Sequence, residues 1–380
     1  MNTGEQRNRL ELLKTVVRKF DLYGEFIDAK PFGSGHINGT FVSLWNQAGT
    51  PVRYLHQRIN EKVFLHPDEV MDNIQRVTSH IMKKLELSGV PDRSRRTSQV
   101  VPAKNGELWV RDETGGWWRT YLFIEGVKTC ELAGSPGQAR ILGSAVGKFQ
   151  KLLADLPGPR LHESIPHFHD MVFRYLHFDE TRKRDVCKRA AGSDAEIAFM
   201  NENRTRGEML IRNLMDGGLP ERICHNDTKM NNILFNEELT EGICVTDLDT
   251  VMPGTVLYDV GDLIRTVATR AAEDETDLSV VRFDTEYFEA LVDGYLSEAA
   301  CFLTDAESAL IAEAGRYITH IMALRFLTDY LEGDIYYKTG RAEHNLDRCR
   351  NQIALIRDMD NQWDSIMEIL RNLRLRYAQI

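Results

Sequence analysis

The sequence has no apolar run long enough to cross a membrane and no closely spaced pair of cysteines. A membrane-spanning helix requires about 20 consecutive apolar residues, and the 380 residues contain no such run. The six cysteines, at positions 130, 187, 224, 244, 301 and 349, form no CxxC motif. This spacing indicates neither a zinc site nor a disulfide framework. We therefore expect reduced thiols and no membrane partner.

The sequence also has fewer basic than acidic residues. Lys and Arg together number 47 against 57 for Asp and Glu, which gives a net charge of −10. A nucleic acid or an anionic membrane surface requires a basic partner, so the charge balance argues against both. The chain has no internal repeat and no low-complexity segment, and its 42% hydrophobic residues are typical of a globular protein.

The first 20 residues lack the apolar core of a signal peptide. They instead place Leu10, Leu13, Val17 and Phe20 at helical spacing, which predicts an amphipathic helix. We therefore expect a cytoplasmic protein that is a monomer or a small homo-oligomer.

The densest polar chemistry lies in residues 223–262, which read ICHNDTKMNNILFNEELTEGICVTDLDTVMPGTVLYDVGD. Asn232 follows Asp227 by five positions, and an apolar strand delivers Asp247 twenty positions after Asp227. A phosphoryl group in transfer carries charge on three oxygens and needs positioning and metal neutralisation more than covalent help. The spacing of a carboxylate, an amide and a second carboxylate therefore predicts the phosphoryl-transfer site of a kinase.

Each of these three residues has a predicted role. Asp227 is the catalytic base, which orients the attacking hydroxyl and takes its proton. Asn232 and Asp247 supply hard oxygen ligands for Mg²⁺, which binds the phosphates of ATP. Asp and Asn also favour turns and helix caps. A turn or a cap is therefore the alternative interpretation of either motif taken alone. The two motifs together, followed by YDVGD, favour the kinase interpretation.

A glycine-rich turn between two strand-like segments offers a cradle for the nucleotide phosphates. Gly33, Ser34 and Gly35 allow close approach of the backbone, and an ordinary hairpin turn is the alternative. Kinases also carry a lysine on the third strand of the sheet. This chain has Gln57 at that place. Arg58 or a lysine from elsewhere would supply the charge, unless Arg58 is a solvated strand residue.

The pattern predicts two lobes. Residues 1–124 form an N-lobe with the N-terminal helix, the glycine-rich loop, a five-stranded antiparallel sheet and a helix at 67–87. Residues 125–380 form a helical C-lobe with the catalytic loop at 223–234 and the metal-binding segment at 243–262. The hinge residues Phe123, Ile124 and Glu125 are predicted to bind the nucleotide, with backbone groups on the adenine edge. The C-lobe helices are expected at 137–156, 171–189, 194–215, 259–270, 285–299, 305–331 and 345–375.

Two further clusters carry polar or aromatic groups. His162, His167 and His169 lie in an irregular stretch without additional clustered ligands, which favours packing or hydrogen bonding over a metal site. Residues 325–337, RFLTDYLEGDIYY, combine charges and aromatic rings at the end of a long helix. Such residues suit a sugar, because charged groups bind hydroxyls and aromatic faces cover the ring. The alternative is a helix-terminal salt-bridge cluster.

The sequence resembles the N-acetylhexosamine 1-kinases of the aminoglycoside phosphotransferase-like superfamily over nearly the whole chain. The segments that carry the resemblance are GSGHINGTF, HFHD, HNDTKMNNIL, DLDTVMPG, YDVGDLIR and RFLTDYLEGDIYY. It implies an α+β, bilobal protein-kinase-like fold with an antiparallel β N-lobe, one packed helix and a mainly helical C-lobe. It also implies transfer of the ATP γ-phosphate to the anomeric hydroxyl of N-acetylglucosamine or N-acetylgalactosamine.

The resemblance assigns roles to individual residues. Asp227 matches the general base, and Asn232 and Asp247 match the magnesium-binding positions. The residues expected to face the sugar, besides Asp227, are His36, Arg325, Asp329 and Asp334. The subfamily resembles this chain in carrying glutamine in place of the strand-three lysine.

Two alternatives stay open at this point. The same fold accepts other substrates, such as another free sugar, an aminoglycoside or an amino alcohol, because fold does not fix the acceptor. The missing lysine also allows a pseudokinase that binds nucleotide without turnover. The intact set of Asp227, Asn232 and Asp247 argues against the pseudokinase.

Overall fold

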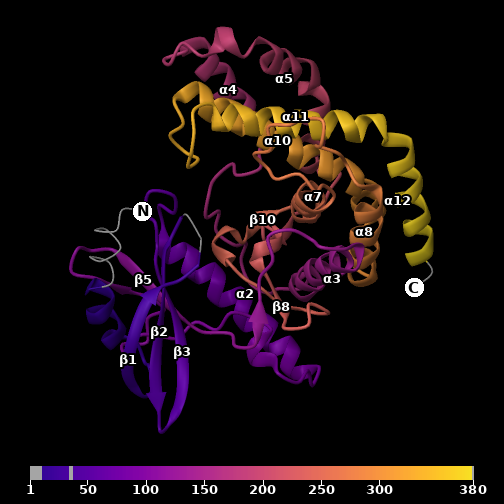
Figure 1. Ribbon diagram of the computed structural model, residues 1–380. Helices are drawn as coiled ribbons and strands as arrows, with labels where there is room; N and C mark the ends of the chain where they lie inside the picture. Colours follow the sequence, from indigo (N-terminus) through magenta and orange to yellow (C-terminus); the bar gives the residue numbers. More distant parts are fainter. Residues whose placement is uncertain (1–10, 34–36, 379–380) are drawn as a thin grey trace. The chain divides into compact units, whose positions relative to one another are not determined.

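The computed structural model describes residues 11–33 and 37–378 (Figure 1). The chain forms two compact units. The N-terminal unit comprises Met1–Val127, Gly158–Ile165 and Thr246–Val251, and the C-terminal unit comprises Lys128–Pro157, Pro166–Val245 and Met252–Ile380. The predicted lobe boundary follows residue 124, whereas the compact division adds two short later segments to the N-terminal unit. One of these segments carries Asp247.

The N-terminal unit contains a five-stranded antiparallel sheet of order β1-β2-β3-β5-β4 (Figure 1). In the β3–β5 pairing, Gln57 lies directly opposite Arg119. The bounds of the strands are β1 Glu25–Pro31, β2 Gly39–Gln47, β3 Thr50–Arg58, β4 Val110–Arg111 and β5 Trp117–Leu122.

One face of this sheet is covered by the N-terminal helical segment. Residues 11–16 are helical and continue into a 3₁₀ turn, η1 (Val17–Lys19). Leu13, Val17 and Phe20 are buried in a core with sheet residues such as Trp45 and Trp118. Each such side chain contributes about 1.5–3 kcal/mol by leaving water. Leu10, predicted for the same face, lies outside the described residues.

The helix α2 (Pro67–Leu87) spans the residues predicted for it. Proline at its start fits the first helical turn, where a backbone N–H has no partner within the helix. The apolar side chains at three- and four-residue spacing are buried, as an amphipathic helix requires: Val70, Ile74, Val77, Ile81 and Leu85.

The C-terminal unit is mainly helical, as predicted. Its strands are short: β7 (Arg222–Cys224) pairs with β10 (Met252–Gly254), and β8 (Ile233–Asn236) pairs with β9 (Gly242–Val245). The strand β6 (Val127–Lys128) leads into this unit along the chain. The helices are α3 Pro136–Leu153, α4 Met171–Arg184, α5 Asp194–Gly207, α6 Met209–Met215, α7 Val256–Val267, α8 Thr285–Ala299, α9 Asp305–Ala309, α10 Ile311–Glu332, α11 His344–Asn361 and α12 Trp363–Tyr377.

Several helices end earlier than the hydrophobic periodicity predicts. The helix expected at 171–189 stops at Arg184, because Asp185 adopts a left-handed conformation (φ 36°) that cannot continue a right-handed helix. The segment expected at 305–331 starts as a separate helix, α9, with a capping box between Thr304 and Glu307. Such breaks are hard to predict from sequence, because they depend on the backbone conformation of single residues and on local caps.

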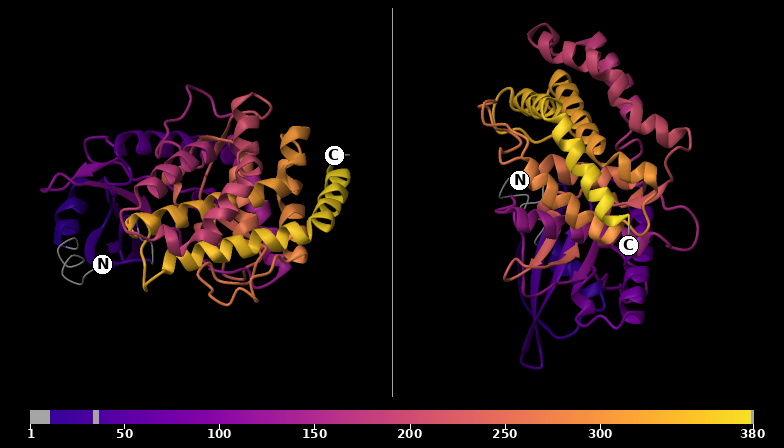
Figure 2. Two further views of the ribbon diagram at one scale, coloured as in Figure 1. Left: turned by 90° about the horizontal axis from the view of Figure 1, so that it is seen from above. Right: turned by 90° about the vertical axis from the view of Figure 1, so that its right-hand side faces the viewer.

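The helix α10 is the centre of the C-terminal unit. Twenty of its 22 residues are buried, and it packs against α4, α7 and α11 (Figure 2). A helix that is buried on every side belongs to the core of a large unit.

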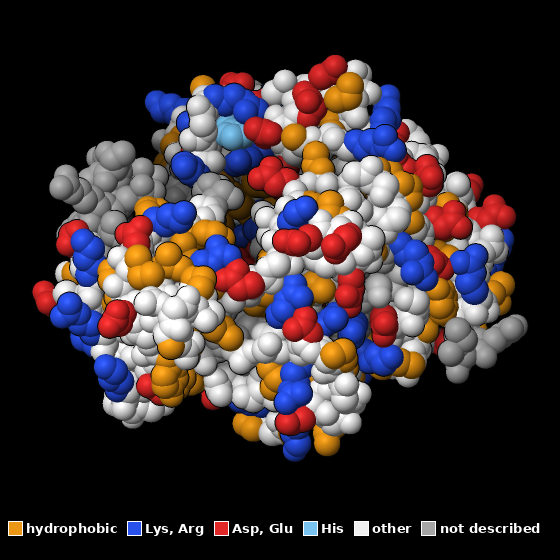
Figure 3. All heavy atoms as spheres, turned by 60° about the horizontal axis from the view of Figure 1, so that its bottom comes forward, with side chains coloured by type: hydrophobic (Ala, Val, Ile, Leu, Met, Phe, Trp, Pro, Cys, Tyr) orange, Lys and Arg blue, Asp and Glu red, His pale blue; other side chains and the backbone are white. Residues whose placement is uncertain are grey.

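Within the part of the chain that the structure describes, no helix has the length and apolar character to cross a membrane. Basic and acidic side chains are interspersed on the face shown in Figure 3.

The helices α3 and α8 approach closely through glycines. A Cβ at Gly143 of α3 would collide with the backbone oxygen of Leu291, and one at Gly147 would lie 2.7 Å from the backbone oxygen of Tyr295. Gly294 of α8 faces the backbone of Arg140 in the same way. Glycine at these positions therefore fixes the distance between the two helices.

We predict that Gly143→Ala destabilises the protein by about 1–3 kcal/mol, the usual cost of overpacking. The measurement is the midpoint of thermal or urea unfolding. Gly137→Ala is the matched control on the same helix, because a Cβ there meets only the Oγ of Ser135 at an ordinary 3.6 Å. Equal midpoints for the two variants would contradict the close-packing argument.

Candidate active site

The loop that follows β7 is held by one buried carboxylate, that of Asp259 on α7. The backbone N–H of His225 donates to Asp259 Oδ2 at 3.0 Å, and that of Asn226 donates to Oδ1 at 2.7 Å. The hydroxyl of Thr228 donates to the backbone oxygen of Asp259 at 2.7 Å. These contacts place Asp227 at a fixed position, because its two neighbours on either side are tied to α7.

Asp259 is itself oriented by α3. Gln150 Nε2 donates to its Oδ2 at 2.9 Å, and Tyr295 donates its hydroxyl hydrogen to Gln150 Oε1 at 2.6 Å. Burial raises the pKa of Asp259, and the donors around it offset that rise only in part. The carboxylate therefore depends on its full set of hydrogen bonds.

Asp227, the predicted base, keeps 28% of its side chain exposed. Lys229 Nζ lies 3.0 Å from Asp227 Oδ2, and Asn232 Nδ2 donates to the same oxygen at 3.1 Å and to the backbone oxygen of Asp227 at 2.8 Å. Burial alone would raise the pKa of Asp227, but Lys229, His225 and Asn232 outweigh it and lower the pKa. Asp227 is thus ionised at neutral pH and able to accept a hydrogen bond from a hydroxyl.

Lys229 was not among the predicted site residues. Its position two residues after the base was visible in the sequence, but the search for a cation was directed at the third strand. In the structure, Lys229 forms an ion pair with Asp227. A positive charge at this place suits a reaction that develops negative charge on phosphate oxygens.

The predicted magnesium ligands have the right chemistry for that ion. The amide nitrogen of Asn232 points at Asp227, so its carbonyl oxygen is turned away from that carboxylate. Asp247 offers a carboxylate from the N-terminal unit, in a left-handed backbone conformation (φ 61°). Carboxylate and amide oxygens with phosphate oxygens are the usual ligands of Mg²⁺. Among the described residues no cluster of three or more His, Cys, Asp or Glu could hold a metal by itself.

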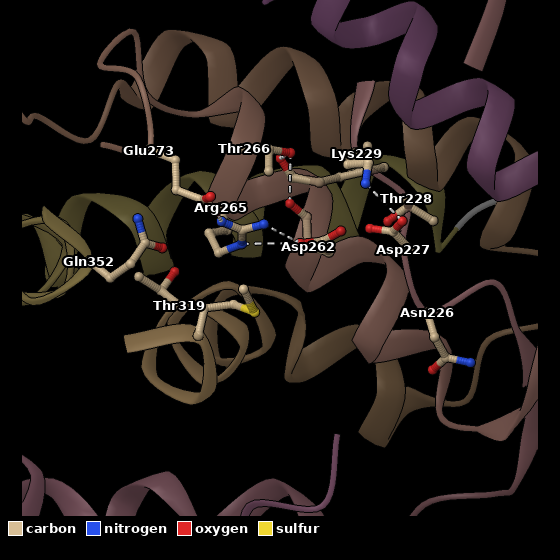
Figure 4. Close-up of polar contacts among 12 residues, drawn as sticks. Asn226, Asp227, Thr228, Lys229, Asp262, Arg265, Thr266, Glu273, Thr319 and Gln352 are labelled. Carbon is tan, nitrogen blue, oxygen red and sulfur yellow. Dashed lines mark hydrogen bonds and ion pairs between the residues drawn. The ribbon is translucent and has the colours of Figure 1, made fainter. Parts of the chain in front are cut away.

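A second acid, Asp262 of α7, lies beside Asp227 and Lys229 (Figure 4). Arg265 donates twice to Asp262 Oδ1, at 3.1 and 2.9 Å, and also bonds Glu273 at 2.6 Å. Burial raises the pKa of Asp262, and the negative charge of Asp227 adds to the rise. The pair Asp262 and Arg265 thus lies next to the loop that carries Asp227 (Figure 4).

His169 supports the loop from another side. One ring nitrogen, Nε2, lies 2.9 Å from the backbone oxygen of Asn226, so it donates a hydrogen bond there. Burial lowers the pKa of His169 to about 3, so the ring is neutral at physiological pH. This contact agrees with the predicted hydrogen-bonding role. His167 pairs instead with Asp170 at 2.9 Å.

In the C-terminal unit, Arg325 lies near Asp227, and Arg174 lies near Arg325. The guanidinium of Arg325 stands over the ring of Phe168 at 4.9 Å and near the rings of Tyr336 and Tyr337 at 5.6 and 5.5 Å. Burial, with the nearby charge of Arg325, lowers the pKa of Arg174 to about 10. Among the described acids, none lies within ion-pair distance of either guanidinium, although the charge of Asp227 acts on Arg325 and that of Asp170 on Arg174. The two guanidinium groups can donate hydrogen bonds to the oxygens of a bound molecule.

Asp329 and Asp334 organise the turn that follows α10. The two oxygens of Asp329 accept the backbone N–H groups of residues 335, 336 and 337 at 2.7–3.0 Å and the amide of Asn345 at 2.8 Å. Asp334 accepts from Arg189 at 2.6 Å and from Asn345 at 2.9 Å. Four donors use the whole acceptor capacity of Asp329, so its evident work is to hold the two tyrosines in place.

The predicted nucleotide residues fall in the N-terminal unit. Gly33 adopts a left-handed conformation (φ 74°) with open space around it, while Ser34, Gly35 and His36 lie outside the described residues. Gln57 Oε1 accepts two hydrogen bonds from Arg119, at 2.9 and 2.7 Å. Sequence analysis missed Arg119, because the strand pairing that brings it to Gln57 is not visible in the sequence.

Arg58, the other possible source of charge, is engaged elsewhere. Its Nε lies 3.1 Å from the buried carboxylate of Asp112. Arg58 is therefore a structural partner on the sheet.

The predicted hinge residues form a small stack of groups. The ring of Phe123 lies between the ring of Phe32 at 5.4 Å and the guanidinium of Arg53 at 4.0 Å. Arg53 Nε donates to the side chain of Glu125 at 2.8 Å, and Arg95 donates to the Glu125 backbone oxygen at 3.0 Å. Nucleotide binding by Phe123, Ile124 and Glu125 stays a prediction.

Comparison with solved structures shows a protein-kinase-like fold, as predicted. The chain is similar to an aminoglycoside phosphotransferase from Alicyclobacillus acidocaldarius, with 13% identity, a TM-score of 0.57 and coverage of 97% of this chain and 96% of the other. It is also similar to an ethanolamine kinase from Plasmodium vivax, with 14% identity, a TM-score of 0.55 and coverage of 86% and 82%.

A third similar structure contains bound ligands. It is the spectinomycin phosphotransferase APH(9)-Ia in complex with ADP and spectinomycin, with 14% identity, a TM-score of 0.51 and coverage of 97% and 98%. At the level of sequence, residues 28–301 match the profile of the phosphotransferase enzyme family.

We predict that Asp259→Asn lowers stability by about 1–3 kcal/mol, because the new amide NH₂ group faces a donor where an acceptor is needed. It also lowers kcat by at least about tenfold, since the loop that carries Asp227 loses an anchor. The measurements are urea unfolding and steady-state kinetics.

The matched control is Asp284→Asn at the start of α8. There a single oxygen accepts the backbone N–H groups of Glu286 and Tyr287, and an asparagine caps a helix equally well. If Asp259→Asn behaved like this control, Asp259 would not be the anchor of the loop.

Proposed function

Because the chain belongs to the phosphotransferase enzyme family, we propose that it is an ATP- and Mg²⁺-dependent kinase for the anomeric 1-hydroxyl of an N-acetylhexosamine. N-acetylglucosamine and N-acetylgalactosamine are the two acceptors. The proposal extends the family assignment, which establishes a small-molecule phosphotransferase, by naming the acceptor. Cytoplasmic location and a monomeric or small oligomeric state stay predictions.

The observation that carries the acceptor proposal is Arg325, which lies near Asp227, with Arg174 near Arg325. The aminoglycoside and ethanolamine of the similar proteins are cations at neutral pH, and the positive charges of these two arginines oppose them. A neutral N-acetylated sugar instead offers hydroxyl and carbonyl oxygens to the arginines. The rings of Phe168, Tyr336 and Tyr337 offer apolar faces for the sugar ring.

In the proposed reaction, Asp227 accepts a hydrogen bond from the anomeric hydroxyl and takes its proton as the oxygen attacks the γ-phosphate. Lys229, 3.0 Å from Asp227, keeps the base ionised before the reaction. Arg325 and Asp334 contribute to the acceptor region, together with the predicted residue His36. Asp329 acts on the acceptor through the turn that it holds, which carries Tyr336 and Tyr337.

Magnesium and nucleotide complete the site. Asn232 and Asp247 would hold Mg²⁺, which neutralises the phosphate charge when bound. The glycine-rich loop at Gly33 and the hinge at Phe123 are proposed to bind ATP. The ADP found in the spectinomycin phosphotransferase supports a nucleotide in this fold.

The test of function is product formation from ATP and Mg²⁺ with N-acetylglucosamine, N-acetylgalactosamine, glucose and an aminoglycoside, followed by phosphorus NMR. We expect a sugar 1-phosphate from the N-acetylated sugars. Asp227→Asn should lower turnover by about 10²–10⁴-fold, the contribution of a general base, with unchanged circular dichroism. Phosphate on another hydroxyl or another acceptor would keep the kinase and overturn the acceptor. Nucleotide binding without turnover on any acceptor would favour the pseudokinase alternative.

We further predict that Arg325→Leu raises KM for the sugar by about 10–100-fold, because a hydrogen bond to a charged group contributes about 1.5–3 kcal/mol. KM for ATP should stay within about twofold. Arg357→Leu is the control, since Arg357 is exposed and stacks on Phe199 at 5.4 Å. A similar rise of both KM values would place Arg325 outside the acceptor site.

A further inference from the structure

A buried polar network surrounds the segment 246–251 within the N-terminal unit, and no role assigned so far explains it. Its central cation is Arg119 of β5, whose side chain is 1% exposed. Arg119 Nε and Nη2 donate to Gln57 Oε1 at 2.9 and 2.7 Å, and Nη1 donates to Asp249 Oδ1. The side chain of Asp249 is 4% exposed, so the two charges form a buried ion pair.

The network continues to the end of the glycine-rich loop. Asn38 Nδ2 donates to Asp249 Oδ2 at 2.6 Å, and Asn38 Oδ1 accepts the backbone N–H of Asn60 at 3.0 Å. Burial alone would lower the pKa of Arg119, but the charge of Asp249 and its other neighbours raises it, so the guanidinium is always charged. Asp249 thus receives one charged donor from β5 and one neutral donor from the residue that precedes β2.

A buried ion pair is a weak source of stability, because removing two charges from water costs about as much as their attraction returns. Its presence here therefore calls for a geometric explanation. The backbone of Asp247, two residues before Asp249, has φ 61° and ψ 55°. This left-handed conformation is unfavourable for most residues with a Cβ, although Asp adopts it more readily than most.

The segment that follows Asp247 is held at two points. Arg119 and Asn38 hold Asp249, and Asn73 of α2 donates to the backbone oxygen of Val251 at 3.0 Å. The same amide of Asn73 donates to the backbone oxygen of His162 at 2.8 Å. The segment that carries Asp247 is therefore tied to the sheet and to α2 at two successive points.

We propose that Arg119 and Asp249 are a positioning pair that holds the carboxylate of Asp247 in its metal-binding conformation. Kinases carry a cation on the third strand. In this chain the corresponding cation is Arg119 of β5, and Gln57 of β3 orients it. The hydrogen-bond donors of Arg119 are engaged by Gln57 and Asp249, so Arg119 acts on the metal-binding segment. This inference rests on the proposed role of Asp247 as a magnesium ligand, but it is independent of the acceptor.

The experiment measures ADP binding by calorimetry with and without Mg²⁺, in the absence of any acceptor. In the wild type, Mg²⁺ should strengthen ADP binding. In Asp249→Asn, which keeps the size of the side chain but removes its charge and one of its two acceptor oxygens, we expect this Mg²⁺ enhancement to fall by about 10-fold or more. That is the usual effect of removing a group that orients a metal ligand. ADP affinity without Mg²⁺ should change less than about twofold.

Arg119→Lys and Arg119→Met form the second arm. The lysine retains the charge beside Asp249 and should keep part of the Mg²⁺ enhancement, whereas the methionine should lose it. The matched control is Asp112→Asn, which breaks the other buried pair of the same sheet, Arg58–Asp112. Asp112→Asn should lower the unfolding midpoint and leave the Mg²⁺ enhancement unchanged.

The possible results separate cleanly. A folded Asp249→Asn or Arg119→Met with the wild-type Mg²⁺ enhancement overturns the positioning pair. Loss of the enhancement in Asp112→Asn as well, in step with the unfolding midpoint, also overturns it, because the pair would then act only through stability. A wild type without any Mg²⁺ enhancement overturns the metal role of Asp247 itself. Failure of the N-acetylhexosamine proposal would leave all these results unaffected, since no acceptor is present.

Discussion

The catalytic loop depends on the buried carboxylate of Asp259. It accepts the backbone N–H groups of His225 and Asn226, which would otherwise be unpaired in the interior. Neither Asp259 nor its partner Gln150 has a chemical role in the proposed reaction. They determine where Asp227 stands, and the reaction requires a hydroxyl to meet a carboxylate at a defined place.

The two units use the same physical device. In each, a buried acid holds a short segment whose neighbouring residue has left-handed backbone: Asp259 holds Asn226 (φ 66°), and Asp249 lies two residues after Asp247 (φ 61°). The carboxylates predicted to act in the reaction, Asp227 and Asp247, are therefore different from those that hold the backbone, Asp259 and Asp249. Burial suits the holding acids, because hydrogen bonds are stronger away from water. Asp227 keeps part of its surface exposed for a substrate.

Short-range features of the sequence predicted much of this. The spacing of Asp227, Asn232 and Asp247 indicated a kinase, and the periodicity at 67–87 gave α2 its correct bounds. The pairs that position these groups could not be predicted in the same way. Arg119 reaches Gln57 only because β5 pairs with β3, and Asp249 reaches Arg119 from 130 residues further along the chain. Such contacts depend on strand order and register, which the sequence of one protein does not display.

The same limit applies to the helices and to the acceptor region. The sequence did not indicate the end of α4 at Arg184, which the left-handed backbone of Asp185 determines. The family resemblance predicted that Asp329 faces the sugar, and this stays a prediction. The sequence did not indicate that three backbone donors of the following turn and the amide of Asn345 in α11 converge on its carboxylate.

The dependence of the loop on α7 has a consequence for the growing chain on the ribosome. Asp259 follows Asp227 in the sequence, and α8, which orients Gln150 through Tyr295, follows later still. A nascent chain that has emerged only as far as β9 carries the base without the group that fixes its backbone. The position of Asp227 is therefore fixed only after α7 and α8 have been synthesised and have packed on α3.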